Sequence, residues 1–368
     1  MFARLRRIVS QSRDRGPLHM LTDPDLVISV VVAGVIGVRL VLAGLARVRR
    51  PPSAVGDPTL ARFLDSHATR ATHRLVVIVA EPGSVRSAYI RADRTSAFEV
   101  GSVSKVFTAL LVADAVDRGV LTADTTAGEL CPLTGDAATA TVGQLATHRS
   151  GLPRIPGDAT TMLRGLAFAI WGANPYRGTG RDRLLATVDR ARIRHRGDVR
   201  TYSNMGAALL GHLAVAASGE ESYDVTVRDR VWARMGMTAT GVSTRARHAP
   251  RGWRGGLRPA QWSSEGYAPA GGVVSTPDDM ARFAAAMVGG DVPGLATALS
   301  PVDGGGGDPW LWARGRQPMS FWHNGETGGY SAYVSLVRGD RPRATVLMSD
   351  RAPVTPIMRL AEQVARVG

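Results

Sequence analysis

Strand-forming segments lie near both ends of the chain, and the sequence between them is mostly helical. Four short runs rich in β-branched residues are predicted to form strands: residues 74–80, 85–91, 333–337 and 344–348. Helical patterns flank these strands, at about residues 57–72 and 353–367. This order is satisfied by one antiparallel sheet made from both ends of the chain. N- and C-terminal helices would flank the sheet, and the mostly helical middle would be inserted into it. We therefore predict an α+β fold.

The chain has a single lysine, Lys105, so 44 of its 45 basic residues are arginines. Unlike arginine, lysine can lose its proton near neutral pH when it is desolvated or lies beside another cation. Ser102 precedes it by three residues, and the apolar pattern that follows predicts a helix ending near Gly119, so both side chains share one helix face. A weak nucleophile beside an activatable base is the smallest unit of covalent catalysis. The alternative interpretation is a helix cap with a long basic side chain.

Further helix signals lie in the middle of the chain. Thr141 and Gln144 fit a capping box for a short helix over residues 142–149. His148 lies in this helix, and we interpret it as a structural residue. Residues 155–200 are interpreted as a helical insertion.

Tyr202 and Asn204 stand at the start of an apolar helix that ends near Gly219. One interpretation is plain capping, with Asn204 as the N-cap. The other places a phenol and a carboxamide at the edge of a cleft, where a phenol next to an ammonium group would have a lowered pKa and could carry a proton. Further along, Thr276 is predicted to cap a helix that has Pro277 at its first position.

Composition excludes some functional classes. The formal net charge is +14, but no block of basic residues is interleaved with aromatic ones, so we expect no nucleic-acid partner. The one cysteine, Cys131, excludes an internal disulfide.

The first 57 residues are predicted to form a membrane anchor and its flanks. Residues 26–46 are apolar apart from a serine, three glycines and Arg39, and this run is long enough to span a hydrocarbon core. Residues 1–25 would then form a basic tail, residues 47–57 a linker, and residues 58–368 the catalytic domain. Arginines flank the run on both sides, so the charge pattern does not choose an orientation. The alternatives are an amphipathic tail or an upstream extension that the native product lacks.

Three short motifs, in this order, resemble the signatures of the serine β-lactamase and penicillin-binding protein superfamily. They are Ser102-x-x-Lys105, Tyr202-x-Asn204 and His323-x-Gly325. The sequence around them is similar to the class C-like branch, and the resemblance extends from about residue 58 to 366. The class A versions of the second and third motifs are Ser-Asp-Asn and Lys-Thr-Gly, which this chain lacks.

The resemblance implies a serine hydrolase that forms an acyl-enzyme with a small-molecule or peptide substrate. Ser102 would attack the carbonyl carbon, and Lys105 and Tyr202 would share the role of base, with Tyr202 protonating the leaving group. Asn204 would orient Lys105 and the substrate amide. Backbone N–H groups of Ser102 and Glu326 would form the oxyanion hole. Neither a metal nor an organic cofactor is expected, and the catalytic domain is expected to be extracytoplasmic, held at the cell membrane by a single span.

His323 and Gly325 define where a substrate would lie. Gly325 would leave the strand free of a side chain there. His323 stands where many β-lactamases have a lysine that binds the substrate carboxylate, and a histidine is charged only below a pH of about 6.5. We therefore expect weak or absent β-lactamase turnover, with peptides, amides or esters as the other substrate classes. Two alternative functions remain: a catalytically idle penicillin-binding-like module, and a cytosolic esterase with a spurious N-terminal extension.

Overall fold

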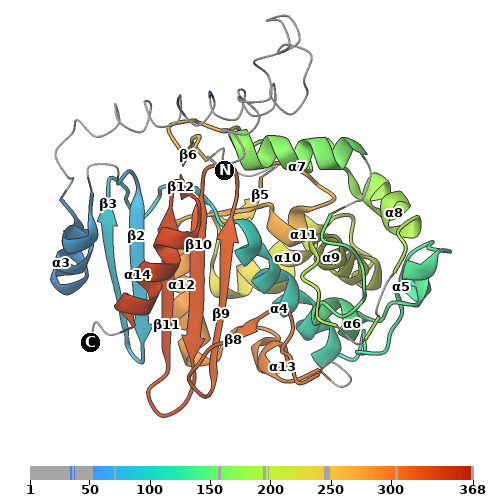
Figure 1. The fold of residues 1–368 in the computed structure, drawn as a ribbon. Helices are drawn as coiled ribbons and strands as arrows, with labels where there is room; N and C mark the ends of the chain where they lie inside the picture. The colour runs from blue at the N-terminus through green and yellow to red at the C-terminus, as the bar shows by residue number, and fades with distance from the viewer. Residues whose placement is uncertain are drawn as a thin grey trace, which may run out of the picture. The chain divides into compact units, whose positions relative to one another are not determined.

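The computed structural model describes Gly34, Gly37 and residues 53–69, 72–155, 159–193, 196–197, 199–243, 249–302 and 306–365. In this described part, seven antiparallel strands form one sheet. In spatial order the strands are β1 (Val55–Gly56), β3 (Ser84–Ile90), β2 (Leu75–Glu81), β11 (Arg343–Ser349), β10 (Ser331–Val337), β9 (Ser320–Glu326) and β8 (Ala313–Arg314). Strands β2 and β11 pair with Val77 opposite Leu347, which joins the two ends of the chain (Figure 1). The predicted α+β fold is confirmed.

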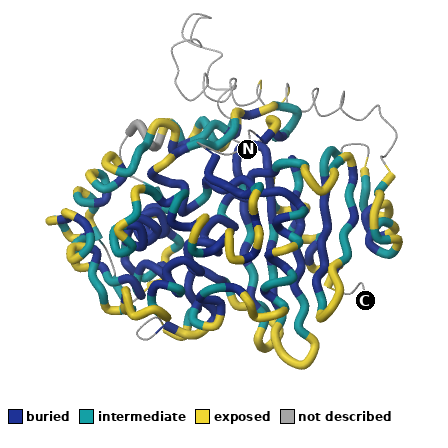
Figure 2. Tube along the Cα trace, turned by 180° about the vertical axis from the view of Figure 1, so that it is seen from behind, coloured by how far each residue is buried: buried dark blue, intermediate teal, exposed yellow. Residues whose placement is uncertain are grey.

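Helices cover both faces of this sheet, which explains why strand β2 is apolar at nearly every position. Helices α3 (Pro58–His67) and α14 (Thr355–Val364) share one apolar cluster with alternate residues of β2, such as Val77. The intervening residues, such as Val76, face a larger cluster that includes helix α12 (Pro277–Gly289). Figure 1 shows α14 in front of the sheet and α12 behind it. Figure 2 shows the centre of the molecule buried, with exposed residues mainly at loops and outer helices.

The middle of the chain is mostly helical, as predicted. Its α-helices are α4 (Ser104–Asp117), α5 (Ala127–Leu130), α6 (Val142–Ala146), α7 (Ala159–Trp171), α8 (Arg181–Asp189), α9 (Asn204–Ser218), α10 (Tyr223–Val227), α11 (Ala268–Gly271) and α13 (Leu295–Leu299). Shorter helical turns are η3 (Gly101–Val103), η4 (Asp136–Thr139), η5 (Arg228–Trp232) and η6 (Ala233–Met235). The central helices α4, α9 and α11 pack against one another.

Two small sheets connect distant segments. Strands β4 (Phe98–Glu99), β7 (Val273–Ser275) and β5 (Gly241–Val242) form the first, and β12 (Arg351–Ala352) and β6 (Trp253–Arg254) form the second. Because β4 pairs with β7, the residues just before Ser102 are held next to the segment that follows α11.

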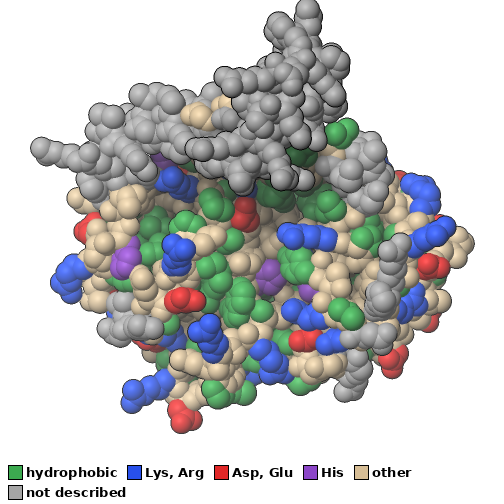
Figure 3. Space-filling view, viewed as in Figure 1, with side chains coloured by type: hydrophobic (Ala, Val, Ile, Leu, Met, Phe, Trp, Pro, Cys, Tyr) green, Lys and Arg blue, Asp and Glu red, His purple; other side chains and the backbone are tan. Residues whose placement is uncertain are grey.

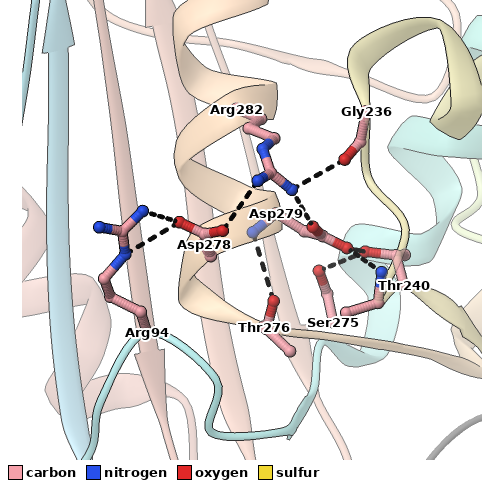
Figure 4. Close-up of polar contacts among 9 residues, drawn as sticks. Arg94, Gly236, Thr240, Ser275, Thr276, Asp278, Asp279 and Arg282 are labelled. Atoms are coloured by element: carbon pink, nitrogen blue, oxygen red, sulfur yellow. Dashed lines mark hydrogen bonds and ion pairs between the residues drawn. The ribbon is translucent and has the colours of Figure 1, made fainter.

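The start of helix α12 agrees with the capping prediction. The hydroxyl of Thr276 accepts a hydrogen bond from the backbone N of Asp279, and Pro277 occupies the first helical position. The Asp279 side chain is buried and accepts from the Thr240 hydroxyl, the Ala239 backbone N and Arg282 (Figure 4). This carboxylate ties α12 to the chain before β5.

The short helix α6 is confirmed in its start and corrected in its end. Thr141 and Gln144 form the predicted capping box. The helix ends at Ala146 and not at residue 149. His148 lies outside it, with a positive φ of 58°, and its ring packs against the ring of Tyr202.

The predicted anchor, residues 26–46, lies outside the described residues apart from Gly34 and Gly37, as do the tail over 1–25 and the start of the linker. None of the helices in the described part combines the length and hydropathy that a membrane crossing needs. The anchor therefore stays a prediction.

Candidate active site

Ser102 lies in the turn η3, immediately before helix α4, and its side chain is partly exposed. The prediction placed it in the first turn of the helix, whereas it lies two residues before Ser104, the first residue of α4. Gly101 has a φ of +53°, and a Cβ added there would lie 2.6 Å from the backbone N of Glu326. A glycine is therefore needed for η3 to approach strand β9 this closely.

Lys105 is the second residue of α4 and is fully buried. Its Nζ lies 3.1 Å from Ser102 Oγ, 2.8 Å from Asn204 Oδ1 and 2.6 Å from the carbonyl O of Ala270. Burial holds the pKa of Lys105 well below its ordinary value, and the charge of Arg154 lowers it further. The partners of this lysine are all uncharged, which is uncommon for a buried ammonium group and typical of a lysine that works as a neutral amine.

Tyr202 completes the contacts to the serine, since its hydroxyl donates to Ser102 Oγ at 2.9 Å. The expected lowering of its pKa is wrong: burial raises the pKa of Tyr202 to about 12, against smaller lowering effects of the Ser102 hydrogen bond and of Arg154. The pKa of this phenol responds to its own burial more than to neighbouring charges, and the residue pattern alone does not show that burial. The phenol therefore stays protonated at neutral pH.

Asn204 is not the N-cap of α9, which corrects the capping interpretation. Ser203 is the cap, and its hydroxyl accepts a hydrogen bond from the backbone N of Gly206. The Asn204 carboxamide is therefore available to bridge two side chains. Its Oδ1 accepts from Lys105, and its Nδ2 donates to the Tyr176 hydroxyl at 2.7 Å.

The third predicted motif lies on strand β9, next to η3. A Cβ on Gly325 would lie 1.9 Å from the carbonyl O of Val100 and 2.9 Å from the backbone N of Ser102. Strand β8 pairs with β9 only at Phe321 and Trp322, so this end of β9 has no strand partner on its outer edge among the described residues. The unpaired edge of β9 at Gly325 is thus in direct contact with η3, the turn that carries Ser102.

His323 has a lower pKa than the ordinary value assumed for it, whereas Glu326 presents its backbone N as expected. His323 is buried, and burial, followed by the effect of Lys105, lowers its pKa to about 3. It is therefore neutral at physiological pH, and its Nδ1 bonds to the carbonyl O of Asn324 at 2.6 Å. The side chain of Glu326 pairs with Arg254, so it is the backbone N, near Gly101, that faces the nucleophile turn.

Two side chains that sequence reasoning missed lie around this group. Glu99 is buried, and its carboxylate accepts hydrogen bonds from the Thr327 hydroxyl and from the backbone N of Trp262. Burial raises its pKa to about 7. The available sequence signal for Glu99 was an acidic residue between two apolar residues, shortly before Ser102. Tyr176, the partner of Asn204, lies in a segment where no sequence signal marked it.

The contacts of His148 support the structural interpretation. It is buried, its Nδ1 accepts from the backbone N of Ser203 at 3.2 Å, and its ring packs against that of Tyr202. Burial holds its pKa well below the ordinary value. Figure 3 shows histidine side chains in the middle of the face next to β9, with basic side chains on either side. Among the residues with described positions, no three His, Cys, Asp or Glu side chains gather in a way that could hold a metal ion.

Three comparisons with known proteins bear on this arrangement. The chain is 28% identical over 302 residues to penicillin-binding protein 4 of Amycolatopsis lactamdurans, covering 71% of this chain and 74% of that protein. It is 27% identical over 283 residues to a human beta-lactamase-like protein, covering 70% of this chain and 55% of the human one. This chain thus spans about half of the human protein's length.

A solved structure and a family model complete the comparison. The class C beta-lactamase from Rhodobacter sphaeroides aligns with a TM-score of 0.63 over 83% of this chain and 96% of that chain, at 18% identity, which shows a shared fold. The family model described as Beta-lactamase matches residues 60–367, which is most of the chain. This chain therefore belongs to the beta-lactamase family, within the serine β-lactamase and penicillin-binding protein superfamily.

Proposed function

We propose that this protein is a serine hydrolase that cleaves amide, peptide or ester bonds through an acyl-enzyme on Ser102. One observation carries the proposal: Ser102 Oγ lies within hydrogen-bond distance of both Lys105 Nζ, at 3.1 Å, and the Tyr202 hydroxyl, at 2.9 Å. A nucleophile that touches two proton carriers is the arrangement that covalent catalysis by serine needs.

Lys105 is proposed to be the base. A neutral amine has two hydrogens and one lone pair. Asn204 Oδ1 and the carbonyl O of Ala270 can only accept, so they take the two hydrogens. The lone pair of the neutral amine then faces Ser102 Oγ and can accept its proton. The lowered pKa of Lys105 supports this, because the amine is then unprotonated in a larger share of molecules near neutral pH.

Tyr202 is proposed to be the acid. Because its pKa is about 12, the phenol holds its proton while Ser102 attacks. As the carbonyl–leaving-group bond breaks, Tyr202 gives this proton to the leaving group, and the proton that Lys105 took from the serine restores the phenol. Water then hydrolyses the acyl-enzyme, with the same two groups moving the proton in reverse.

The oxyanion is proposed to bind the backbone N–H groups of Ser102 and Glu326. The close approach of η3 to β9 supports this, since an added Cβ on Gly101 would lie 2.6 Å from the Glu326 N and one on Gly325 would lie 2.9 Å from the Ser102 N.

A low β-lactamase activity is proposed for the same site. The relatives have names of both a penicillin-binding protein and β-lactamases, so the names do not choose a substrate. His323 favours the other classes because it is neutral and buried and so provides no charge for the carboxylate of a β-lactam. Rapid nitrocefin hydrolysis by the purified protein would refute this part of the proposal.

Covalent labelling tests the hydrolase proposal. The full chain is treated with a fluorescent fluorophosphonate and a fluorescent penicillin, and intact mass is then measured after exposure to D-Ala-D-Ala peptides, short esters and β-lactams. Labelling should vanish in Ser102→Ala and persist in Ser84→Ala, which changes an exposed serine of a hairpin. Ser203→Ala is a poor control because Ser203 caps the helix that carries Asn204. If no probe labels the wild-type protein, the chain is an idle binding module.

Residues 26–46 are proposed to anchor the protein in the cell membrane, with the catalytic domain outside the cytoplasm. The length and apolar character of this run support the proposal. Residues 1–57 fused to an alkaline phosphatase reporter should stay in the membrane fraction after alkaline extraction and give an active reporter. Release of the reporter would favour a cytosolic esterase.

A further inference from the structure

Arg154 places an exposed positive charge beside the proposed catalytic residues. Its guanidinium carbon lies 5.6 Å from the centre of the Tyr202 ring, and its backbone carbonyl accepts a hydrogen bond from the backbone N of Asn204. It is close enough to Lys105 for its charge to disfavour the ammonium form. Within the described residues, the ring contact is the one interaction of this guanidinium, which forms no ion pair there.

The other cationic side chains near the site have an acidic partner or are buried. Arg200 pairs with Asp308, and Arg254 pairs with Glu326. His323 and Lys105 are buried among uncharged groups. Arg154 is therefore the described cation that lies against the Tyr202 ring without an acidic partner among the described residues, whereas Arg200 contacts Asp308 through its Nε at 3.6 Å.

No described acidic side chain near the site pairs with the Arg154 guanidinium. Glu326 is turned to Arg254, Glu99 is buried against Thr327 and Trp262, and Asp308 is shared by Arg149 and Arg200. An anion that reaches this site from solvent thus meets a guanidinium that pairs with no described acidic side chain and that has the planar donor geometry matching a carboxylate.

We propose that Arg154 is a specificity-determining residue that binds a carboxylate of the substrate, so the enzyme prefers substrates with a carboxylate close to the bond that it cleaves. This inference rests on the proposed hydrolase function. It places the recognition of the carboxylate on the Tyr202 side of Ser102, whereas the lysine expected on strand β9 in many relatives is replaced by His323.

Two matched pairs of esters test the proposal with the full chain. 4-Nitrophenyl pentanoate and the 4-nitrophenyl monoester of glutaric acid differ by a carboxylate on the acyl side. Phenyl acetate and 3-carboxyphenyl acetate differ by a carboxylate on the leaving group. The measured quantity is the ratio of kcat/KM for the anionic ester to that for the neutral one. Because Arg154 also acts on Lys105, its loss changes the chemical step for both members of a pair, and the ratio isolates recognition.

In Arg154→Gln this ratio should fall about tenfold in at least one pair, as expected for the loss of a charge-assisted hydrogen bond. The affected pair shows which side of the substrate carries the carboxylate. Arg154→Lys should recover part of the ratio. Arg359→Gln, which removes an exposed arginine on α14, should leave it unchanged.

The two possible failures are distinguishable. If wild type hydrolyses the neutral esters but Arg154→Gln leaves both ratios unchanged, the role of Arg154 is overturned and the hydrolase proposal stands. If wild type hydrolyses neither neutral ester and no probe labels Ser102, the hydrolase proposal fails, and the role of Arg154 fails with it.

Discussion

At the scale of single residues, the burial of Lys105 without an acidic partner is the most informative feature of this protein. Leaving an ammonium group buried and unpaired costs several kcal/mol, and proteins avoid this by shifting the pKa so that the group becomes neutral. Arginine cannot respond in this way because it stays charged. This difference gives a physical reason why position 105 is a lysine in a chain whose other basic residues are all arginines.

We predict that Lys105→Arg lowers the rate of acylation by about two to four orders of magnitude, the usual effect of losing a general base. The rate of fluorophosphonate labelling measures this, and the thermal unfolding midpoint shows whether the larger side chain is accommodated. A folded Lys105→Arg protein that is labelled at nearly the wild-type rate would show that Lys105 is not the base.

The pH dependence of kcat/KM should carry the signature of Lys105. The base works unprotonated, so activity should decrease as the pH falls through the lowered pKa of this lysine. Arg154 contributes to that lowering, so Arg154→Gln should raise the pKa of Lys105 and move the acidic limb to higher pH. Arg359→Gln is the matched control and should not move it. An acidic limb that stays in place or moves to lower pH in Arg154→Gln would contradict the assignment.

At the scale of elements, local signals predicted the starts of α6 and α12 and the end of α9 at Gly219, but neither the end of α6 nor the cap of α9. The capping box at Thr141 and the cap at Thr276 follow from hydrogen bonds within four residues, so a short window of sequence contains them. The end of α6 and the cap of α9 depend on partners outside such a window. Ser203 caps α9 while its own hydroxyl donates to Pro153 O, some 50 residues earlier. That contact decides against Asn204 as the cap.

Asp279 shows how one buried side chain holds two elements together (Figure 4). We predict that Asp279→Ala lowers the free energy of unfolding by about 2–3 kcal/mol, because Ala239 N and other buried donors lose their acceptor. Asp278→Ala is the matched control on the same turn of α12. It removes more exposed ion pairs with Arg94 and Arg282 and should cost less than about 1 kcal/mol. Equal losses in urea unfolding would show that burial of Asp279 contributes nothing specific.

At the scale of the whole molecule, the site lies where segments far apart in the chain meet. The order of strands and helices predicted the main sheet, because strand pairs and terminal helices are readable from local patterns, but not the two small sheets. The residues of the site were predicted from the three motifs together with the family resemblance. Tyr176 and the carbonyl of Ala270 could not be predicted, since their role arises only when helices α9 and α11 pack on α4.

Glu99 connects three such segments, because it accepts from Thr327 after β9 and from Trp262 in the loop before α11. Its pKa in the folded protein is raised from 4.5 to about 7, mainly by burial. Between pH 4.5 and about 7, the folded state therefore binds more protons at Glu99 than the unfolded state does. It follows that Glu99 reduces the stability of the protein progressively as the pH rises through this range.

We predict that Glu99→Gln removes this loss of stability at higher pH. Glutamine keeps the shape and can hydrogen-bond the same partners, since the Thr327 hydroxyl can accept as well as donate. Relative to wild type, the variant should be nearly equal in free energy of unfolding at pH 4.5 and more stable at pH 8, by on the order of 2–3 kcal/mol. Urea unfolding at several pH values measures the difference in free energy of unfolding between the two proteins. The contributions of Asp350 and the buried histidines to the pH dependence cancel in this difference, because both proteins contain them. Glu362→Gln, on the exposed side of α14, should show no such trend. If the difference between Glu99→Gln and wild type is the same at both pH values, Glu99 is ionised in the folded protein across this range.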